Sequence, residues 1–581
     1  MNGFSQNLIS YSKQISLGFR ELRHLSLSRL RKVFSLMGKN EKIAVGALFV
    51  LAVLSLFVSL RNVYYAHTIP APNFGGSYTE GLIGQPTYIN PLLANMEPDF
   101  SITNLIFSGL YKYDSTGQLV PDLAEGMPII SQDQKEYTIN LKPNLKWQNG
   151  KPLTADDVIF TIGLLQDANY KSPLWPLWQA TTVSKLSDYS VKFTTKDISG
   201  PFINNLAIHI LPKSVWGSVD AQNFLLSKNN LEAVGSGPYA IKQIKKLPSG
   251  KVEEISLKSN PDYYDGKPKI DQLIFKFYDN EDDILNAFHS REIDGFGFVP
   301  LGSDIRLDSN QPQAQILTVP LPQYQIAFFN LNNKILNDQN VRLALSLATN
   351  KQQIIDNVFG GNAFLPVSPW LGQGVAAATS TVDINQAQSL LDSAGWKIDP
   401  KTGIRTNKQG KALAFTISTN DSLVNSKAAE TLADQWKALN ITVNLNILPS
   451  KQLTDTLIKP RTFDVLLFPQ KFGADPDPFP FWHSSQVKDP GFNLTGFSDP
   501  VADKLIIDAR TTTDKTVQTQ DYQQFNSLIM SKVPIIFLDQ TEYIYAIDSG
   551  IKNVHLNVLF DPSQRFNTIN QWYAAEKRVW K

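Results

Sequence analysis

The sequence predicts a mixed α/β protein with more than one globular unit, preceded by a single membrane-spanning helix. The chain has 581 residues, which is more than one hydrophobic core usually organises. Its body alternates strand-like and helix-like patterns, with no internal repeat and no low-complexity tract. Near the N-terminus, residues 43–60 form an uninterrupted uncharged run, "IAVGALFVLAVLSLFVSL".

The apolar run 43–60 is the predicted membrane span. At about 1.5 Å per residue it almost crosses a hydrocarbon core of about 30 Å. Lys39 and Lys42 precede it, and Arg61 follows. Because positive residues favour the cytoplasmic side, we expect the N-terminus inside and the body outside the cytoplasmic membrane.

A cleaved signal peptide is the competing interpretation of this run. The basic segment before it is too long for a signal peptide, and cleavage after Ala66 would place Tyr64 where a small residue is needed. We therefore expect an uncleaved, single-pass anchor, with Tyr64 and Tyr65 at the outer interface.

Charge and cysteine content exclude several kinds of partner, cross-link and anchor. Residues 1–42 carry eight basic and two acidic side chains, so that a chain of net charge +1 has a body of net charge −5. The N-terminal segment is therefore a basic cytoplasmic tail, which either lies on the anionic inner leaflet or is disordered. The acidic body predicts no nucleic-acid partner. The absence of cysteine excludes disulfides, thiolate metal sites and cysteine-linked lipid anchors.

The body contains recognisable strands and helices. Alternating patterns predict half-buried strands at 137–141 and 189–195, and more continuously apolar runs predict strands covered on both faces at 324–331 and 463–469. Apolar spacing of three and four residues predicts amphipathic helices at 282–294, 427–439 and 501–510.

No pattern in the sequence indicates catalysis. The six histidines are scattered, and neither a nucleophile elbow, a dinucleotide loop nor a Walker motif is present. The acidic cluster at 279–283 is typical of a helix start, where carboxylates favour the helix dipole. We expect no enzyme, no cofactor and no metal.

The stretch "KWQNGKPLTADDVIF" (146–160) has the residue types of a site but is better explained as scaffold. Asn149-Gly150 is a turn, and Thr154 is a helix N-cap whose hydroxyl and the Asp157 carboxylate would form a capping box. Val158 then begins a buried face of the helix.

An ordered series of segments resembles the extracytoplasmic solute-binding proteins of peptide/nickel-type ABC importers. The series includes "LVPDLAEGM" (119–127), "YTINLKPNLKWQNGKPLTADDVIFT" (137–161), "VGSGPYAI" (234–241), "IAFFNLNNKILNDQNVRLALSLATN" (326–350) and "DPDPFPFWHSSQ" (475–486). The resemblance covers nearly all of 73–581.

The resemblance implies a two-lobed periplasmic-binding-protein-like fold of type II, in the large class with an extra subdomain. A linker at 61–74 would lead to lobe I (75–111, 235–322 and 540–581), with an inserted subdomain at 112–234 and lobe II at 323–539. The stretch 146–160 would then lie away from the ligand cleft.

The implied function is capture of oligopeptides or a related small solute by closure of the two lobes, followed by delivery to ABC permease subunits. A monomer is expected. The alternative is a membrane-tethered peptide sensor or chaperone of the same fold without transport.

Peptide-binding members of this family hold the ligand's amino terminus with an aspartate. The corresponding place here is Phe472, with Lys471 adjacent, so the identity of the ligand stays open. Candidate ligand-binding residues are Asp475, Asp477, Trp482, His483, Tyr324 and Trp370. For the two aspartates a rigid Asp-Pro turn is the competing interpretation, and for the aromatic residues it is a packed loop anchor.

Overall fold

The computed structural model describes residues 35–298, 314–371, 381–474, 477–512 and 514–581. The chain divides into two compact units. The first comprises the chain up to Pro72 together with Glu576–Lys581, and the second comprises Asn73–Ala575.

The first unit contains helix α3 (Lys39–His67), which includes the predicted span 43–60 and has no buried residue. It is long and apolar enough to cross a membrane. The segment expected as a linker, 61–74, is helical up to His67 and then forms strand β1 (Thr68–Asn73). Strand β1 pairs with the C-terminal strand β21 (Ala575–Trp580).

The second unit is built on an eleven-stranded mixed sheet. Ten strands follow one another across it in the order β18 (Thr442–Leu448), β17 (Ala414–Asn420), β19 (Val465–Lys471), β13 (Ala314–Phe329), β20 (Ile535–Asp548), β12 (Gly295–Gly297), β2 (Ser77–Ile83), β11 (Gln272–Tyr278), β10 (Val252–Ser259) and β9 (Tyr239–Lys246), while β14 (Ala363–Phe364) pairs with β20.

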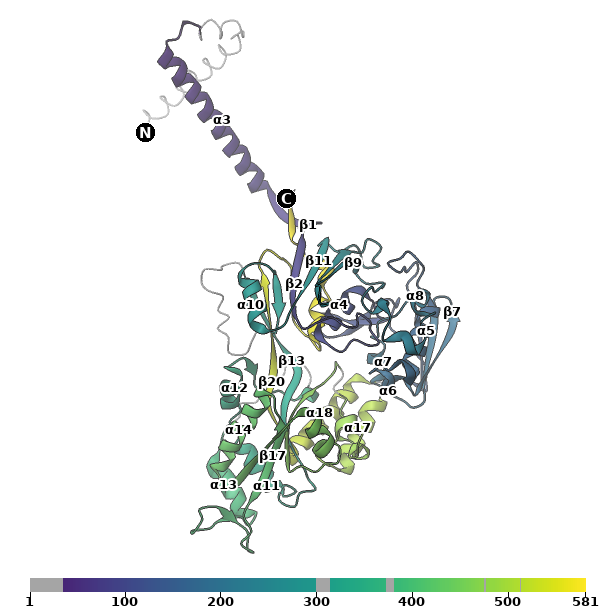
Figure 1. Ribbon diagram of the computed structural model, residues 1–581, viewed down its shortest axis with the longest axis vertical. Helices are drawn as coiled ribbons and strands as arrows, with labels where there is room; N and C mark the ends of the chain where they lie inside the picture. Colours follow the sequence, from purple (N-terminus) through teal and green to yellow (C-terminus); the bar gives the residue numbers. More distant parts are fainter. Residues whose placement is uncertain (1–34, 299–313, 372–380, 475–476, 513) are drawn as a thin grey trace, which may run out of the picture. The chain divides into compact units, whose positions relative to one another are not determined.

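Strands β13 and β20 each contribute to hydrophobic cores of both lobes, and they run side by side through the middle of the sheet (Figure 1). The first half of β13 contributes Val319 and Leu321 to one core, whereas its second half contributes Ala327 and Phe329 to another. The ladder between the two strands is interrupted between Pro320 and Tyr324. The sheet therefore joins the two lobes through two long strands. Their pairing changes register at the point where they pass from one lobe to the other.

The first of these cores lies in the lobe formed by strands β2 and β9 to β11. Its helices are α4 (Glu97–Ile106), α5 (Ala155–Gln166), α6 (Trp175–Trp178), α7 (Phe202–Asn205), α8 (Lys213–Trp216) and α9 (Ala221–Phe224). The same core extends under a four-stranded sheet of β5 (Ile129–Ile130), β6 (Glu136–Asn140), β8 (Ser190–Thr195) and β7 (Thr181–Ser187). A small satellite core packs α10 (Glu281–His289) beside β12.

The second lobe has two cores on opposite faces of its strands. One contains α11 (Gln339–Leu347), α12 (Lys351–Phe359), α13 (Ile384–Ser393) and α14 (Leu423–Lys437). The other contains α15 (Ser450–Leu453), α16 (Phe479–Trp482), α17 (Pro500–Thr511) and α18 (Lys515–Lys532). The remaining described strands form two small pairs: β3 (Tyr111–Tyr113) with β4 (Leu119–Pro121), and β15 (Lys397–Ile398) with β16 (Arg405–Thr406).

The stretch 146–160 has the structural role that the sequence predicts, with one difference in the cap. The Asp157 carboxylate accepts from the Thr154 N–H at 3.0 Å, as expected, but the Asp157 N–H donates to the Thr154 carbonyl oxygen at 3.1 Å and not to its hydroxyl. Asp157 also accepts from the Trp147 indole at 3.3 Å and from the Lys213 N–H at 2.9 Å. The carboxylate therefore organises the local fold, and burial raises its pKa.

Candidate functional site

A cavity of about 170 Å³ lies where the two lobes meet at the register change of β13. Residues that leave the β13–β20 ladder form one wall and the end of β19 forms a second. The rest is formed by α4, by Phe298 after β12, and by the start of a short 3₁₀ helix, η6 (Pro562–Phe566), with the turn before it. The lining residues are Glu97, Phe100, Phe298, Leu321, Pro322, Gln323, Lys471, Phe560, Asp561 and Pro562. We call this cavity the hinge cavity.

An ion pair joins the two lobes at the hinge cavity. Lys471 Nζ at the end of β19 lies 2.7 Å from Asp561 Oδ2, just before η6. Asp561 also accepts from the Ser563 N–H at 3.0 Å, as the N-cap of η6. Burial alone would raise the pKa of Asp561, but the Lys471 ammonium and the Ser563 hydrogen bonds hold this pKa below its usual value.

A buried charge network fixes the first-lobe wall of the cavity. Arg565 Nη2 lies 2.9 Å from Glu80 Oε1, and its Nη1 lies 2.8 Å from Glu97 Oε1. The Tyr545 hydroxyl donates to Glu80 Oε2 at 2.9 Å. The Arg565 and Glu80 side chains are fully buried, and Glu97 is 22% exposed toward the cavity. Because α4, β2, β20 and η6 are tied together here, this wall is rigid.

The aromatic residues expected in the ligand site form a cluster with Phe472 beside the hinge cavity. The Tyr324 and Phe472 ring centroids lie 5.7 Å apart, and the Trp370 and Trp482 centroids also lie 5.7 Å apart. All four rings are at least 96% buried. Tyr324 lies within β13, as the predicted strand at 324–331 implies, although β13 begins earlier, at Ala314. The Phe472 N–H donates to the Pro322 carbonyl oxygen at 2.8 Å, which ties this cluster to the cavity wall.

The polar candidates lie at the edge of the same cluster. His483 Nδ1 lies 2.8 Å from the Ser485 hydroxyl, and the His483 ring packs on Phe479 with centroids 4.6 Å apart. Asp477 Oδ2 lies 3.1 Å from Arg510 Nε, and Asp477 Oδ1 accepts from the Phe479 N–H at 3.0 Å. Burial raises the pKa of Asp477 against the opposing effect of Arg510. Asp475 lies outside the described residues.

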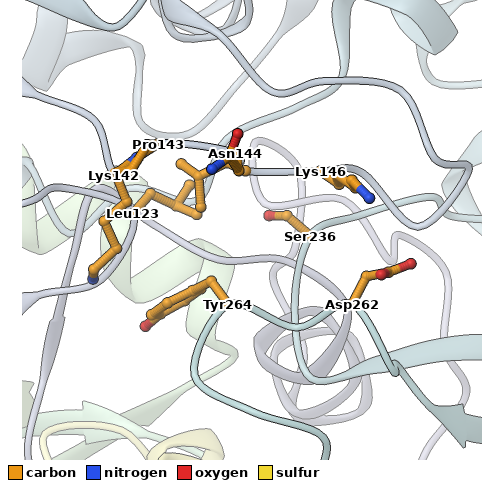
Figure 2. A pocket seen from close by; sticks show the side chains of 9 residues that line it. Leu123, Lys142, Pro143, Asn144, Lys146, Ser236, Asp262 and Tyr264 are labelled. Atoms are coloured by element: carbon orange, nitrogen blue, oxygen red, sulfur yellow. The ribbon is translucent and has the colours of Figure 1, made fainter.

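A larger cavity of about 350 Å³ opens within the first lobe and the 112–234 segment. Figure 2 shows the Ser236 side chain directed toward the middle of its lining, with Lys142 and Lys146 on opposite sides. The Lys142 ammonium lies over the Tyr264 ring at 4.3 Å, and the Tyr264 hydroxyl donates to Asp122. A ligand held here would contact one lobe alone. The hinge cavity is therefore the better candidate for a ligand that couples the two lobes.

The sequence analysis named Lys471 only as the neighbour of Phe472, and it did not identify Asp561, Glu97 or Phe560. The sequence around Asp561, "DPSQRF", is a typical helix cap, and it also serves as one here. Only the pairing across the fold gives Asp561 a place in a site.

A two-lobed α/β fold with a cavity at the junction of the lobes is that of a solute-binding protein, and the predicted fold class is confirmed. Residues 118–492 match the family of bacterial extracellular solute-binding proteins, family 5, and the chain belongs to this family. The predicted resemblance to the solute-binding proteins of peptide/nickel-type ABC importers is likewise confirmed.

Relatives of several specificities resemble this chain over most of its length. The oligopeptide-binding protein AppA of Bacillus subtilis is 28% identical and covers 93% of this chain and 100% of its own. The AppA structure in complex with a nonapeptide has a TM-score of 0.66 at 27% identity, covering 87% of this chain and 100% of AppA. The structure of NikZ from Campylobacter jejuni in complex with Ni(L-His) has a TM-score of 0.66 at 26% identity, covering 86% and 99% of the two chains.

Proposed function

We propose that this chain is a membrane-anchored substrate-binding protein of an ABC importer, which captures an oligopeptide or a related small solute and delivers it to the permease. It acts as a monomer, with α3 in the cytoplasmic membrane, the N-terminus inside and the lobes outside. Its action is binding: a ligand that contacts both lobes shifts the equilibrium toward a closed form that the permease receives.

The observation that carries this proposal is the hinge cavity. It is lined from both lobes and lies at the register change of the two strands that join them. A ligand in this position changes the relative energy of open and closed forms, which a ligand bound to one lobe does not. Peptides are the first ligands to test because the relatives include AppA in complex with a nonapeptide.

We place the ligand between the hinge cavity and the aromatic cluster beside it. Trp482, His483, Asp477, Tyr324, Trp370 and Asp475 remain proposed ligand contacts. The Trp482 indole N–H is buried and has no hydrogen-bond partner among the described residues. A buried donor of this kind is costly to leave unpaired, and a ligand carbonyl oxygen would satisfy it.

Replacement of Trp482 tests this placement. We expect Trp482→Phe to retain most of the packing but to lose the donor, and so to weaken ligand affinity about tenfold, as a hydrogen bond of about 1.4 kcal/mol would. Isothermal titration of the full chain in detergent measures the change. Trp396→Phe, in the other second-lobe core, is the matched control and leaves affinity unchanged. Equal affinities for Trp482→Phe and wild type would remove Trp482 from the site.

The ligand class is tested on the purified full chain. Native mass spectrometry reads any co-purified ligand, and thermal shift with a mixed peptide pool and with Ni²⁺–histidine separates the two classes found among the relatives. A shift with peptides alone supports the proposal, whereas a shift with Ni²⁺–histidine alone replaces the peptide assignment. Membrane retention after alkaline washing tests the anchor separately.

A further inference from the structure

We propose that the C-terminal strand completes a surface for anionic phospholipid headgroups at the outer end of α3. This surface, the interfacial collar, consists of Arg61, Tyr64, Tyr65, Arg578, Trp580 and Lys581. The inference rests on the proposed function in one respect, namely that α3 spans the membrane.

Hydrogen bonds fasten the C-terminal strand to the last turn of α3. Arg578 Nε donates to the Thr68 hydroxyl at 2.8 Å, and its Nη2 donates to the Thr68 and Tyr65 carbonyl oxygens at 2.7 and 3.2 Å. The Lys581 backbone N–H and ammonium donate to the His67 and Ala66 carbonyl oxygens at 2.9 and 2.8 Å. Cations are favoured here because the last carbonyl groups of a helix lack intrahelical partners.

Capping of the helix end does not account for the aromatic part of the collar. The Trp580 ring packs edge-on against Tyr64 with centroids 6.1 Å apart, and it is 68% exposed. Tyr65 is 49% exposed and has two guanidinium groups near its ring, Arg61 at 5.5 Å and Arg578 at 4.4 Å. Exposed tryptophan and tyrosine beside cations have little to gain from water, but they suit the polar region of a bilayer.

The position along α3 places these groups at headgroup depth. The apolar run ends at Leu60, and Arg61 is the first charged residue after it. At about 1.5 Å per residue, Tyr64 and Tyr65 lie roughly 6 to 8 Å beyond the run, within the interfacial layer of a bilayer. Trp580 is held at the same level by its contact with Tyr64. The nearby ammonium and guanidinium groups match the phosphates of anionic lipids.

The test places the full chain in nanodiscs whose phospholipids are brominated near the headgroup end of their acyl chains. The Trp580 emission is obtained as the difference between wild type and Trp580→Phe. We expect the brominated lipid to quench this difference signal strongly relative to unbrominated discs. Trp175→Phe, in the second unit, is the control, and its difference signal stays unquenched.

The headgroup preference is tested in the same discs. We expect stronger quenching with phosphatidylglycerol than with phosphatidylcholine, and we expect Lys581→Gln to reduce this difference, whereas exposed Lys411→Gln in the second unit does not. Unquenched Trp580 in a chain that resists alkaline extraction would overturn the collar while leaving the anchor standing. Quenching that is equal in both lipids would overturn anionic recognition. Extraction of the chain would overturn the anchor and the collar together.

Discussion

At the scale of single residues, the Lys471–Asp561 pair gives the hinge cavity a pH-dependent contact. Asp561 has a lowered pKa in the folded chain, so the contact contributes stability above the ordinary pKa of an aspartate. The contribution is lost as pH falls through the lowered pKa. Because Lys471 is 51% exposed, solvent screening keeps the contribution small, at most about 1 kcal/mol.

Lys471→Gln tests the strength and the sign of this contact. We expect the variant to unfold at a slightly lower temperature at pH 7, and the difference from wild type to shrink as pH falls below about 4. Calorimetry across this pH range measures the effect. Lys276→Gln is the control. It breaks the Lys276–Glu292 pair, which lies away from the cavity, and should therefore change stability without changing ligand affinity. A difference in unfolding temperature between wild type and Lys471→Gln that widens toward acid pH would contradict the stabilising role of this ion pair.

Asp539 is a second titrating group in the connecting strands. It is fully buried in β20, paired in register with Gln325 of β13. Burial raises the pKa of Asp539 to about 8, and the Gln325 backbone offsets this only in part. A carboxyl with a raised pKa in the folded chain is protonated there. The contribution of Asp539 to the free energy of unfolding is therefore fully present below the pKa of the unfolded chain and falls as pH rises toward 8.

Asp539→Asn should therefore stabilise the chain at neutral pH. The neutral amide keeps the shape of the protonated carboxyl and removes the cost of protonating it. That cost grows by about 1.4 kcal/mol for each pH unit above the ordinary pKa of an aspartate, so it reaches a few kcal/mol at pH 7. Chemical denaturation at pH 5 and pH 8 measures the slope, which we expect to flatten in the variant. An unchanged slope would show that another group titrates.

At the scale of elements, glycines decide whether segments can meet. A Cβ on Gly235 would lie 1.9 Å from the Ile106 carbonyl oxygen, at the end of α4. The Gly235 N–H donates to the Gln148 side-chain amide oxygen at 3.0 Å, which joins the 146–160 stretch to this junction. The "VGSGPY" segment is therefore a close-packing element between α4 and β9.

Gly235→Ala should destabilise the first lobe by about 3 kcal/mol or more, because a backbone carbonyl cannot move aside as a flexible side chain can. Gly163→Ala is the matched control: Gly163 lies inside α5 with nothing within 4 Å of the added methyl group. We expect that change to stabilise α5 by up to about 1 kcal/mol. Denaturant midpoints of the two variants should thus move in opposite directions.

At the scale of the whole second unit, two strands connect lobes that have separate cores, so the lobes can move while each stays packed. The ladder interruption between Pro320 and Tyr324 concentrates backbone changes there. The residues at this interruption also line the hinge cavity. In the proposed function, ligand contact and lobe movement are therefore coupled in one place.

Locking the lobes together should abolish binding. The chain has no cysteine of its own, so Lys471→Cys and Asp561→Cys introduce the sole thiols. We expect the double variant to bind no added ligand once a short bifunctional thiol reagent links the two cysteines, and to bind before linking, as isothermal titration would show. Each single variant should bind with and without the reagent. Full binding by the linked protein would rule out ligand entry through this junction.

The sequence alone determined the features that neighbouring residues encode. An apolar run of 18 residues specifies a span, and α3 contains all of it. The helix starts after Thr154 and within the acidic 279–283 segment lie as predicted, since capping and the helix dipole act within one turn. The ligand contacts proposed from the sequence stay predictions.

Only the tertiary structure decided which distant residues meet. Lys471 pairs with Asp561, Glu80 with Arg565, and the C-terminal strand with the segment after α3. Each partner has a satisfactory local interpretation by itself, such as a helix cap at Asp561 or a strand residue at Glu80. The physical reason is that Coulomb and hydrogen-bond energies depend on distance in space, and spacing in the sequence does not fix that distance once the chain crosses between sheets and lobes.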